Sequence, residues 1–170
     1  PEALARWRKE QEEREQARKR SAERALANLA EHRVWERYHA QMDEHARHLW
    51  RKRGVCDSLQ DFWQLGYDKA HRFWRDGHEF ETATLAIPIF GDAWQPLNIK
   101  HRLIDPLVDY SKYRYELIGV TDGLLWRAEP DSELTGHVIA IEGEIKAMVT
   151  AERAGTTVGT IVGLPGTHPS

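Results

Sequence analysis

The sequence has little cysteine, no long apolar segment and few of the motifs that mark common enzyme classes. Cys56 is the single cysteine among 170 residues, so neither an internal disulfide nor a cysteine-rich zinc ribbon is expected within this chain. No window approaches the roughly 18 consecutive apolar residues of a membrane span, and the first residues do not resemble a signal peptide. The motif Gly-x-x-x-x-Gly-Lys-Ser/Thr is absent, which excludes a P-loop motor here. A cytoplasmic location fits these absences best.

The charge is small overall but uneven along the chain. The net formal charge is -3 at pH 7, from 24 Lys and Arg against 27 Asp and Glu. Residues 1–53 contain 14 basic and 10 acidic side chains, whereas residues 54–170 contain 10 basic and 17 acidic ones. The overall charge therefore does not favour nucleic-acid binding, and a site for nucleic acid would have to be a local basic cluster.

The N-terminal third is predicted to be helical. Residues 1–25 are rich in charged helix formers, which is typical of a solvated linker helix and leaves a nucleic-acid-binding arm as the alternative. From Leu26 an apolar stripe predicts one face of an amphipathic helix that ends at Gly54. The stripe comprises Leu26, Leu29, Trp35, Tyr38, Met42, Ala46 and Leu49. Residues 58–61 then predict a capping box at the start of a short helix that Gly66 closes.

Beyond Gly77 the periodicity becomes that of β-strands. Strands are predicted at Thr82–Phe90, Leu97–Ile104, Tyr113–Ile118 and Leu124–Trp126. Pro88 has no N–H to donate, so it favours an edge strand or a bulge. Together these segments predict a small antiparallel sheet.

The last segment has the pattern of an α/β fold. The run His137–Ile141 is almost continuously apolar, which predicts a strand buried on both faces, and Val158–Val162 predicts a second buried strand. Between them a helical stripe of apolar residues ends at Gly155. A strand, a helix and a strand in this order predict a β-α-β unit with a right-handed crossover.

The fold class expected from these patterns is α+β. It consists of one or more long N-terminal helices, a small mixed or antiparallel sheet, and then the first β-α-β unit of a Rossmann-like α/β fold. The expected boundaries are 1–53 for the helices, 54–134 for the sheet subdomain and 135–170 for the start of the α/β domain.

Glu142 is the most informative residue for chemistry, because it follows the apolar run and precedes Gly143 at the start of a helix. Ligands of open α/β sheets bind at the carboxyl ends of the strands, and a carboxylate there suits a hard divalent cation such as Mg²⁺. Glu144 lies near the same helix N-terminus and is a second candidate metal ligand. The alternative is that both glutamates only complement the helix dipole.

Several motifs, taken in order, resemble the catalytic core of bacterial and phage-type DNA primases. Glu142-Gly143-Glu144-Ile145-Lys146-Ala147, followed by Gly163-Leu164-Pro165-Gly166, resembles the start of the TOPRIM domain in phage and plasmid primases. The upstream motifs are Arg51-Lys52-Arg53-Gly54, Leu65-Gly66-Tyr67, Ile87-Pro88-Ile89, Arg102 and Lys112-Tyr113. The resemblance runs from about Tyr38 to the last residue. It implies a fragment that is truncated within the TOPRIM domain, an expectation that the missing initiator Met also favours.

This resemblance implies synthesis of short RNA primers on single-stranded DNA by metal-dependent nucleotidyl transfer, as part of a phage, plasmid or other mobile-element replication protein. Glu142 would be the first TOPRIM acid, acting in binding of Mg²⁺ or Mn²⁺ or as an acid/base. The implied partners are the single-stranded DNA template, nucleoside triphosphates and a replicative helicase. Zinc would be bound only by an upstream module outside this chain.

Basic residues would hold the phosphates of template or nucleotide. The resemblance assigns this role to Arg53, Arg102 and Lys112. Lys100 shares a strand face with Arg102, and Arg114 shares one with Lys112, so the two pairs would form a cationic patch. The alternative is an ordinary solvated sheet face. Two tyrosines next to the second pair, Tyr113 and Tyr115, are expected to point to the opposite face from it and to pack in the core.

Departures from the family pattern leave other functions open. No Asp-x-Asp occurs in the sequence, and Lys146 stands four residues after Glu142, where classical bacterial enzymes have Asp. One Glu cannot hold the metals of phosphoryl transfer, so the chain is expected to be inactive by itself. A non-catalytic nucleic-acid-binding module and a TOPRIM nuclease are the alternatives. The nine histidines, including the helical neighbours His45 and His48, are expected to be solvated because no third ligand has a suitable spacing.

Overall fold

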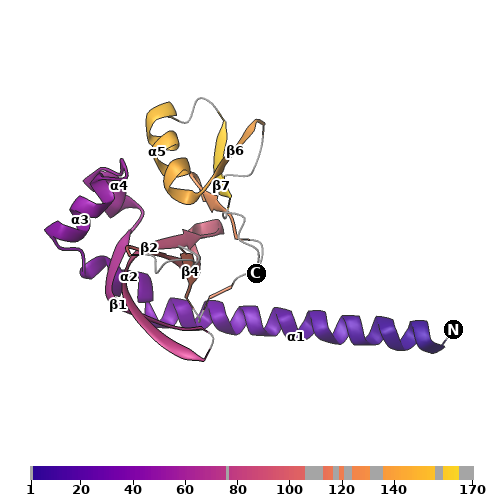
Figure 1. Ribbon diagram of the computed structural model, residues 1–170. Helices are drawn as coiled ribbons and strands as arrows, with labels where there is room; N and C mark the ends of the chain where they lie inside the picture. The colour runs from indigo at the N-terminus through magenta and orange to yellow at the C-terminus, as the bar shows by residue number, and fades with distance from the viewer. Residues whose placement is uncertain are drawn as a thin grey trace.

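The protein combines N-terminal helices with two small sheets in the computed structural model, which describes residues 2–75, 77–105, 113–116, 119–120, 124–130, 136–155 and 159–164 (Figure 1). The helices α1 (Glu2–His32), α2 (Val34–Ala40), α3 (Glu44–Arg51) and α4 (Asp57–Phe62) come first. An antiparallel sheet in the order β1-β2-β3-β4 follows. Its strands are β1 (Gly66–Arg75), β2 (His78–Phe90), β3 (Pro96–Leu103) and β4 (Tyr113–Tyr115), with the short helix η1 (Asp92–Trp94) before β3.

The second sheet has the order β5-β7-β6 and is mixed. It contains β5 (Trp126–Arg127), β6 (Val138–Glu142) and β7 (Thr160–Leu164), and α5 (Glu144–Ala154) connects β6 to β7. β6 and β7 are parallel neighbours, so the predicted β-α-β unit is present. The predicted α+β class is confirmed.

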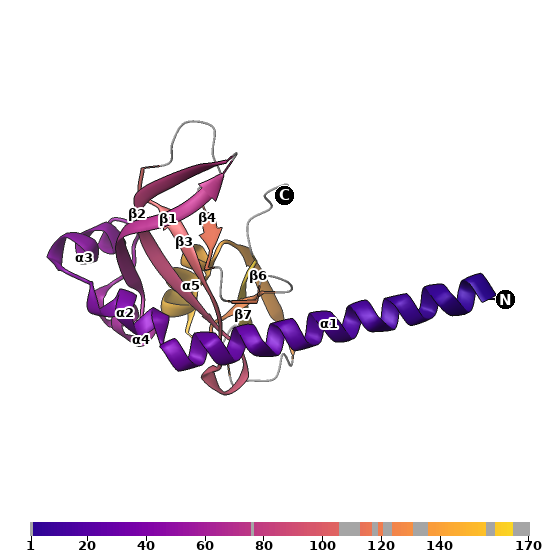
Figure 2. The ribbon, with the colours of Figure 1, turned by 90° about the horizontal axis from the view of Figure 1, so that it is seen from below.

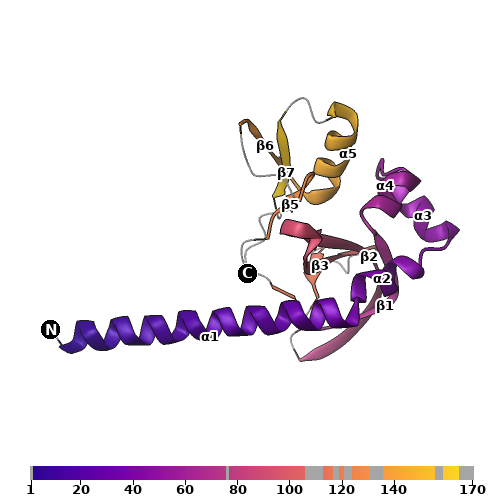
Figure 3. The same ribbon diagram turned by 180° about the vertical axis from the view of Figure 1, so that it is seen from behind.

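The antiparallel sheet lies between α1 and α2 on one side and α5 with the second sheet on the other (Figure 3), and a hydrophobic cluster lies on each side. Ala86 and Ile99 point to one face, called here the α1 face, where they pack against the end of α1 and against α2. Leu85 and Ile87 point to the other, the α5 face, where a larger core contains Trp50 and residues of β5, α5 and β7. The sheet thus separates two hydrophobic cores and contributes side chains to both.

The N-terminal half of α1 projects away from the rest of the molecule (Figures 1 and 2). Its side chains are mostly exposed and include i,i+4 ion pairs between Lys9 and Glu13 and between Lys19 and Glu15. Such pairs stabilise a helix that has no core to pack on. This part agrees with the predicted solvated helix. Among the described residues, no helix is both long and apolar enough to span a membrane.

The prediction of one amphipathic helix over 26–53 is wrong, because the chain turns twice within it. Arg33 adopts a left-handed conformation with φ 45° between α1 and α2. Asp43 begins α3 by accepting a hydrogen bond from the Ala46 N–H at 2.8 Å. The stripe is still buried, but Leu29 lies on the α1 face and Ala46 in the other core. The periodicity of apolar residues indicates which residues are buried, but it does not indicate where one helix ends and the next begins in another direction.

The ends of α4 also differ from the prediction. The helix begins at Asp57, the side chain of its N-cap Cys56 makes no capping hydrogen bond to the helix backbone, and the expected capping box does not form. Gln64, in a left-handed conformation with φ 51°, follows the end of the helix. Gly66 does not close the helix but begins β1, where a Cβ would lie 2.6 Å from the Cβ of Tyr38. Glycine therefore permits α2 to contact β1.

The strand β1 has no counterpart among the predicted strands. Its register with β2 shifts between Asp68 and His71, which marks a bulge. A bulge breaks the alternation of buried and exposed side chains by which strands are recognised. Pro88, by contrast, fits both expectations. It lies beyond the start of β1 and pairs only with Ile99 of β3, next to a second register shift.

The expected burial of the two parallel strands holds for one of them. β7 lies in the middle of its sheet and is buried from Thr160 to Gly163. β6 is an edge strand whose residues alternate between partly buried and exposed, and Val138 is 46% exposed. The prediction of burial on both faces is therefore wrong for β6, because within the described part of the chain α5 covers only one of its faces.

Candidate nucleic-acid and metal site

Glu142 ends β6 and stands directly before the N-terminus of α5. It pairs with Leu164 of β7, and the next N–H, that of Gly143, donates to the Leu164 carbonyl at 2.9 Å. Gly143 has φ 87°, a backbone conformation that residues with a side chain rarely adopt. Glycine therefore lets the strand pass into the helix without a loop. The carboxylate is consequently fixed at the carboxyl end of a strand, where the sequence predicts it.

The Glu142 side chain is open to solvent. It is 75% exposed, and its Oε2 lies 4.0 Å from Nζ of Lys146, which is 72% exposed. An ion pair between such exposed groups contributes little free energy. A divalent cation could therefore displace Lys146 from the carboxylate. Metal binding by Glu142 stays a prediction.

Glu144 points the opposite way, into the interface between α5 and the antiparallel sheet. Its Oε1 accepts a hydrogen bond from Nζ of Lys100 on β3 at 2.7 Å, and the two side chains are only 2% and 3% exposed. The expectations of a metal ligand at Glu144 and of a phosphate contact at Lys100 are therefore not supported. Each charge is already neutralised by the other and is out of reach of solvent.

Two tyrosines of β4 cover the buried ion pair. Nζ of Lys100 lies 4.4 Å from the ring centre of Tyr113 and 5.9 Å from that of Tyr115, distances that allow cation–π attraction. Burial raises the pKa of Tyr115, and the nearby charge of Glu144 raises it further. Both rings are half-buried on the α5 face, so they act as packing groups around Lys100.

Arg53 and Arg102 form the basic part of the site. Arg53 follows α3, whereas Arg102 lies on β3 and donates from Nη1 to the Tyr113 hydroxyl at 2.8 Å. In the described part of the chain, the Nε atoms of both arginines are buried without a hydrogen-bond partner. Burial lowers the pKa of Arg53, and the neighbouring Arg102 charge lowers it further. Two adjacent, partly exposed guanidinium groups are suited to an anion such as a phosphate oxygen.

Arg114 lies on the wrong face for this group. Tyr113 pairs with Arg102, and Arg114 pairs with His101, so Arg114 points to the α1 face. Its guanidinium carbon lies 4.9 Å from the ring centre of Phe73. The prediction that Arg114 joins Lys100 and Arg102 in one patch is therefore wrong. Lys112 lies outside the described residues.

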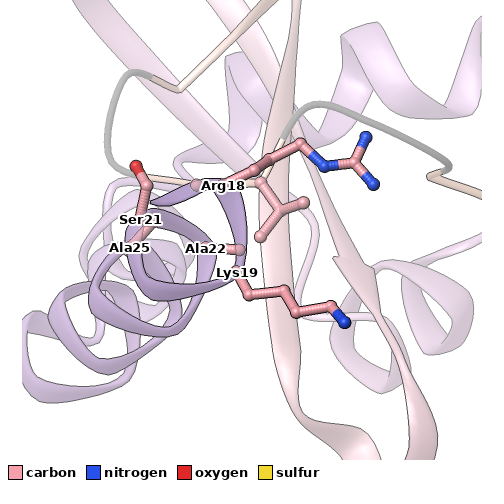
Figure 4. A pocket seen from close by; sticks show the side chains of 7 residues that line it. Arg18, Lys19, Ser21, Ala22 and Ala25 are labelled. Carbon is pink, nitrogen blue, oxygen red and sulfur yellow. The ribbon is translucent and has the colours of Figure 1, made fainter. Parts of the chain in front are cut away.

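A hollow of about 300 Å³ lies between α1 and the segment 119–120 (Figure 4). Arg18 and Lys19 extend from the helix beside it. None of Glu142, Arg53 and Arg102 lines this hollow, so it is separate from the site at α5.

Sequence reasoning missed a second polar cluster, on the α1 face. His71 and His101 are 8% and 0% exposed, so the expectation that the histidines are solvated is wrong for both. The available signal was the alternation in β3, where His101 stands between Ile99 and Leu103 at positions that share one face. A polar residue in such a row is buried unless the strand is irregular.

Comparison with known proteins identifies the fold. No protein-family model and no curated protein matches the sequence. The structure of the Aquifex aeolicus primase, comprising its zinc-binding and RNA polymerase domains, is similar with a TM-score of 0.64 and 15% identity, over 88% of this chain and 44% of that chain. The fold is that of a primase catalytic domain.

Two further primase structures support this conclusion. The RNA polymerase domain of Mycobacterium tuberculosis primase DnaG, in complex with a double-stranded DNA oligomer with a 6-nucleotide overhang, gives a TM-score of 0.60 at 15% identity over 87% of this chain and 56% of that chain. A DnaG primase catalytic domain bound to ssDNA gives 0.57 at 12% identity over 91% and 58%. The chain thus spans about half the length of the primase structures that it matches.

Proposed function

We propose that the chain is part of a DNA primase that synthesises short RNA primers on single-stranded DNA. The observation that carries the proposal is an exposed carboxylate, Glu142, at the carboxyl end of a strand in a primase fold. Glu144, two residues further, is bonded to Lys100 of β3, the strand that also presents Arg102. This contact ties the carboxylate end of the β-α-β unit to the basic strand.

Mg²⁺ or Mn²⁺ would bind at Glu142, whose exposed oxygen atoms suit these hard cations. The metal would neutralise and orient the reacting phosphate oxygens. Because the sequence contains no Asp-x-Asp, the remaining metal ligands of such a motif would come from outside this chain. Arg53 and Arg102, whose side chains are partly exposed, would hold phosphates of the template or of the nucleotide.

Nucleoside triphosphates, a single-stranded template and a replicative helicase are the proposed partners. The Glu-Gly-Glu sequence at 142–144, which resembles the variant found in mobile-element primases, favours a phage or plasmid replication protein as the source.

The test is primer synthesis by the intact protein on single-stranded DNA with labelled nucleotides and Mg²⁺ or Mn²⁺. Glu142→Gln is expected to lower the rate by roughly a hundredfold or more while leaving DNA affinity unchanged, because it removes a metal ligand and no phosphate contact. Glu152→Gln is the matched control, since Glu152 is exposed near the other end of α5. Undiminished synthesis by Glu142→Gln would remove the proposed metal role.

A non-catalytic nucleic-acid-binding module is the second candidate. The ion pair between Glu142 and Lys146 favours it, because Lys146 occupies the position of an expected acid and places a positive charge beside the carboxylate. In that case the intact protein would bind single-stranded DNA through Arg53 and Arg102 but would incorporate no nucleotide with either metal. Binding and incorporation measured on one preparation therefore separate the two candidates.

A further inference from the structure

A second group of ionisable side chains is buried on the α1 face of the antiparallel sheet. It comprises Asp68 and His71 of β1, His101 of β3 and Glu116, which follows β4. Candidate ligand atoms of Asp68, His71 and His101 all lie within 4.8 Å of one another. The α1 face is opposite to the face that carries Lys100 and Arg102, so this cluster takes no part in the site described above.

The bulge in β1 brings two of these residues together. Asp68 and His71 are three positions apart, and in a regular strand such residues point to opposite faces. The register shift between them places both on the α1 face, beside Thr84 of β2. The Thr84 hydroxyl in turn lies 2.9 Å from Nδ1 of His101. Bulges that redirect a side chain are typical of functional sites.

The distance between Asp68 and His71 is that between two ligands of one small cation, whereas His101 is at present hydrogen-bonded to Glu116. Nδ1 of His71 lies 3.3 Å from Oδ2 of Asp68, and Nε2 of His101 lies 3.2 Å from Oε2 of Glu116. Two ligands of one tetrahedral zinc ion are about 3.3 Å apart when each bond is about 2.0–2.1 Å. The two imidazole rings stack with their centres 3.8 Å apart and an interplanar angle of 14°, so one ring would turn to aim its in-plane nitrogen lone pair at a shared ion. Imidazole with carboxylate suits Zn²⁺, whereas Mg²⁺ prefers oxygen ligands alone.

The charge of the cluster also favours a divalent cation. Burial raises the pKa of Glu116, but hydrogen bonds from His101 and Tyr38 outweigh it and leave this pKa lowered. The pKa of Asp68 is lowered in the same way, with burial opposed by the hydrogen bond to His71. Burial lowers the pKa of His101. A divalent ion between Asp68 and the two imidazoles would balance carboxylate charge at this buried site.

We propose that Asp68, His71 and His101 form a zinc site. One ring nitrogen of His101 would exchange its present hydrogen bond, to Glu116 or to Thr84, for the metal. The other would keep its partner, as ligating histidines commonly do. The ion would tie β1 to β3 across β2, beneath Tyr38 of α2, whose ring centre lies 5.0 Å from that of His101. Asp68, 17% exposed, leaves a path from solvent.

Zinc titration of the metal-free full chain against a chromophoric competitor tests the proposal. One equivalent is expected to bind and to raise Tm. Asp68→Asn and His71→Gln are each expected to weaken zinc binding by roughly tenfold or more, because each removes a ligand. His78→Gln is the control, since His78 is exposed at the start of β2, and it is expected to bind zinc as the parent chain does.

Co²⁺ provides a readout that does not depend on the stability of the variants. Bound to the parent chain, it is expected to give the strong visible absorption of a four-coordinate site, and one equivalent of Zn²⁺ should abolish it. The proposal is overturned if the parent chain binds no stoichiometric Zn²⁺ or Co²⁺, or if folded Asp68→Asn and His71→Gln chains bind zinc as tightly as the parent. Neither result bears on primer synthesis, which is tested at Glu142.

Discussion

The two faces of the antiparallel sheet both contain buried polar groups, but the partners of these groups differ. On the α5 face, Lys100 and Glu144 form a closed ion pair, and Arg102 lies beside it. On the α1 face, His101 lies between Thr84 and Glu116 and stacks on His71. The strand β3 supplies both faces in succession, since 100, 101 and 102 alternate. One short strand thus places cationic side chains on one side and a buried imidazole on the other.

Removal of Lys100 should have the largest effect on stability. Lys100→Met leaves the Glu144 carboxylate buried without its partner, so the free energy of unfolding should fall by about 3–5 kcal/mol in urea titrations. The double variant Lys100→Met/Glu144→Leu should recover most of this loss, because it removes both charges together. Lys146→Met, which removes the exposed partner of Glu142, should change stability by no more than about 0.5 kcal/mol.

Equal losses for Lys100→Met and Lys146→Met would show that the α5 face is not closed to water. A double variant as unstable as the single one would instead assign the loss to packing around Tyr113 rather than to charge.

The next effect separates the two faces by nucleic-acid affinity. Arg102→Gln should weaken binding of single-stranded DNA and lower the slope of log affinity against log salt by about one, because one phosphate contact is lost. Arg114→Gln should leave affinity and slope unchanged, since Arg114 points to the α1 face. Fluorescence anisotropy at several salt concentrations measures both. An equal fall of the slope in both variants would contradict the assignment of DNA binding to the α5 face.

The smallest expected effect is a pH dependence of fold stability that is caused by groups on the α1 face. His101 and Glu116 have lowered pKa values in the folded chain, against ordinary values of 6.5 and 4.5. A group with a lowered pKa stabilises the fold above its ordinary pKa, and this stability is lost as the pH falls. The metal-free chain should therefore become less stable in two stages, below about pH 6.5 and again below about pH 4.5. Glu116→Gln should reduce the second stage in urea titrations at stepped pH, because Asp68 with its own lowered pKa remains, and a second stage of undiminished size would assign it to other carboxylates.

The position of Glu142 could be predicted because its causes are local. An apolar strand, a glycine and a helical stripe are adjacent in the sequence, and the structure has a strand, a left-handed Gly143 and a helix in that order. Glu144 and Lys100 could not be paired in this way, because they are 44 residues apart. Each taken alone has the features of a ligand for metal or for phosphate.

Irregular backbone explains two further differences between prediction and structure. Arg33 and the segment 41–43 redirect a stripe that remains buried, so the stripe alone predicts one helix where the chain forms several. The bulge at Asp68 and His71 hides β1 and, at the same time, assembles the histidine cluster. The bulge that prevents β1 from being recognised in the sequence is thus the same bulge that brings the proposed zinc ligands together.

The ion pair between Lys100 and Glu144 limits how the β-α-β unit can move relative to the antiparallel sheet. Swinging the β-α-β unit away from the antiparallel sheet would break this ion pair and expose apolar side chains of the shared core, such as Trp126 and Met148, to water. The two units should therefore move as one body, and any widening needed to admit a long nucleic acid should occur at another joint. By the same rigidity, a small displacement of α5 by a cation at Glu142 would be passed directly to β3 and to the arginine beside it.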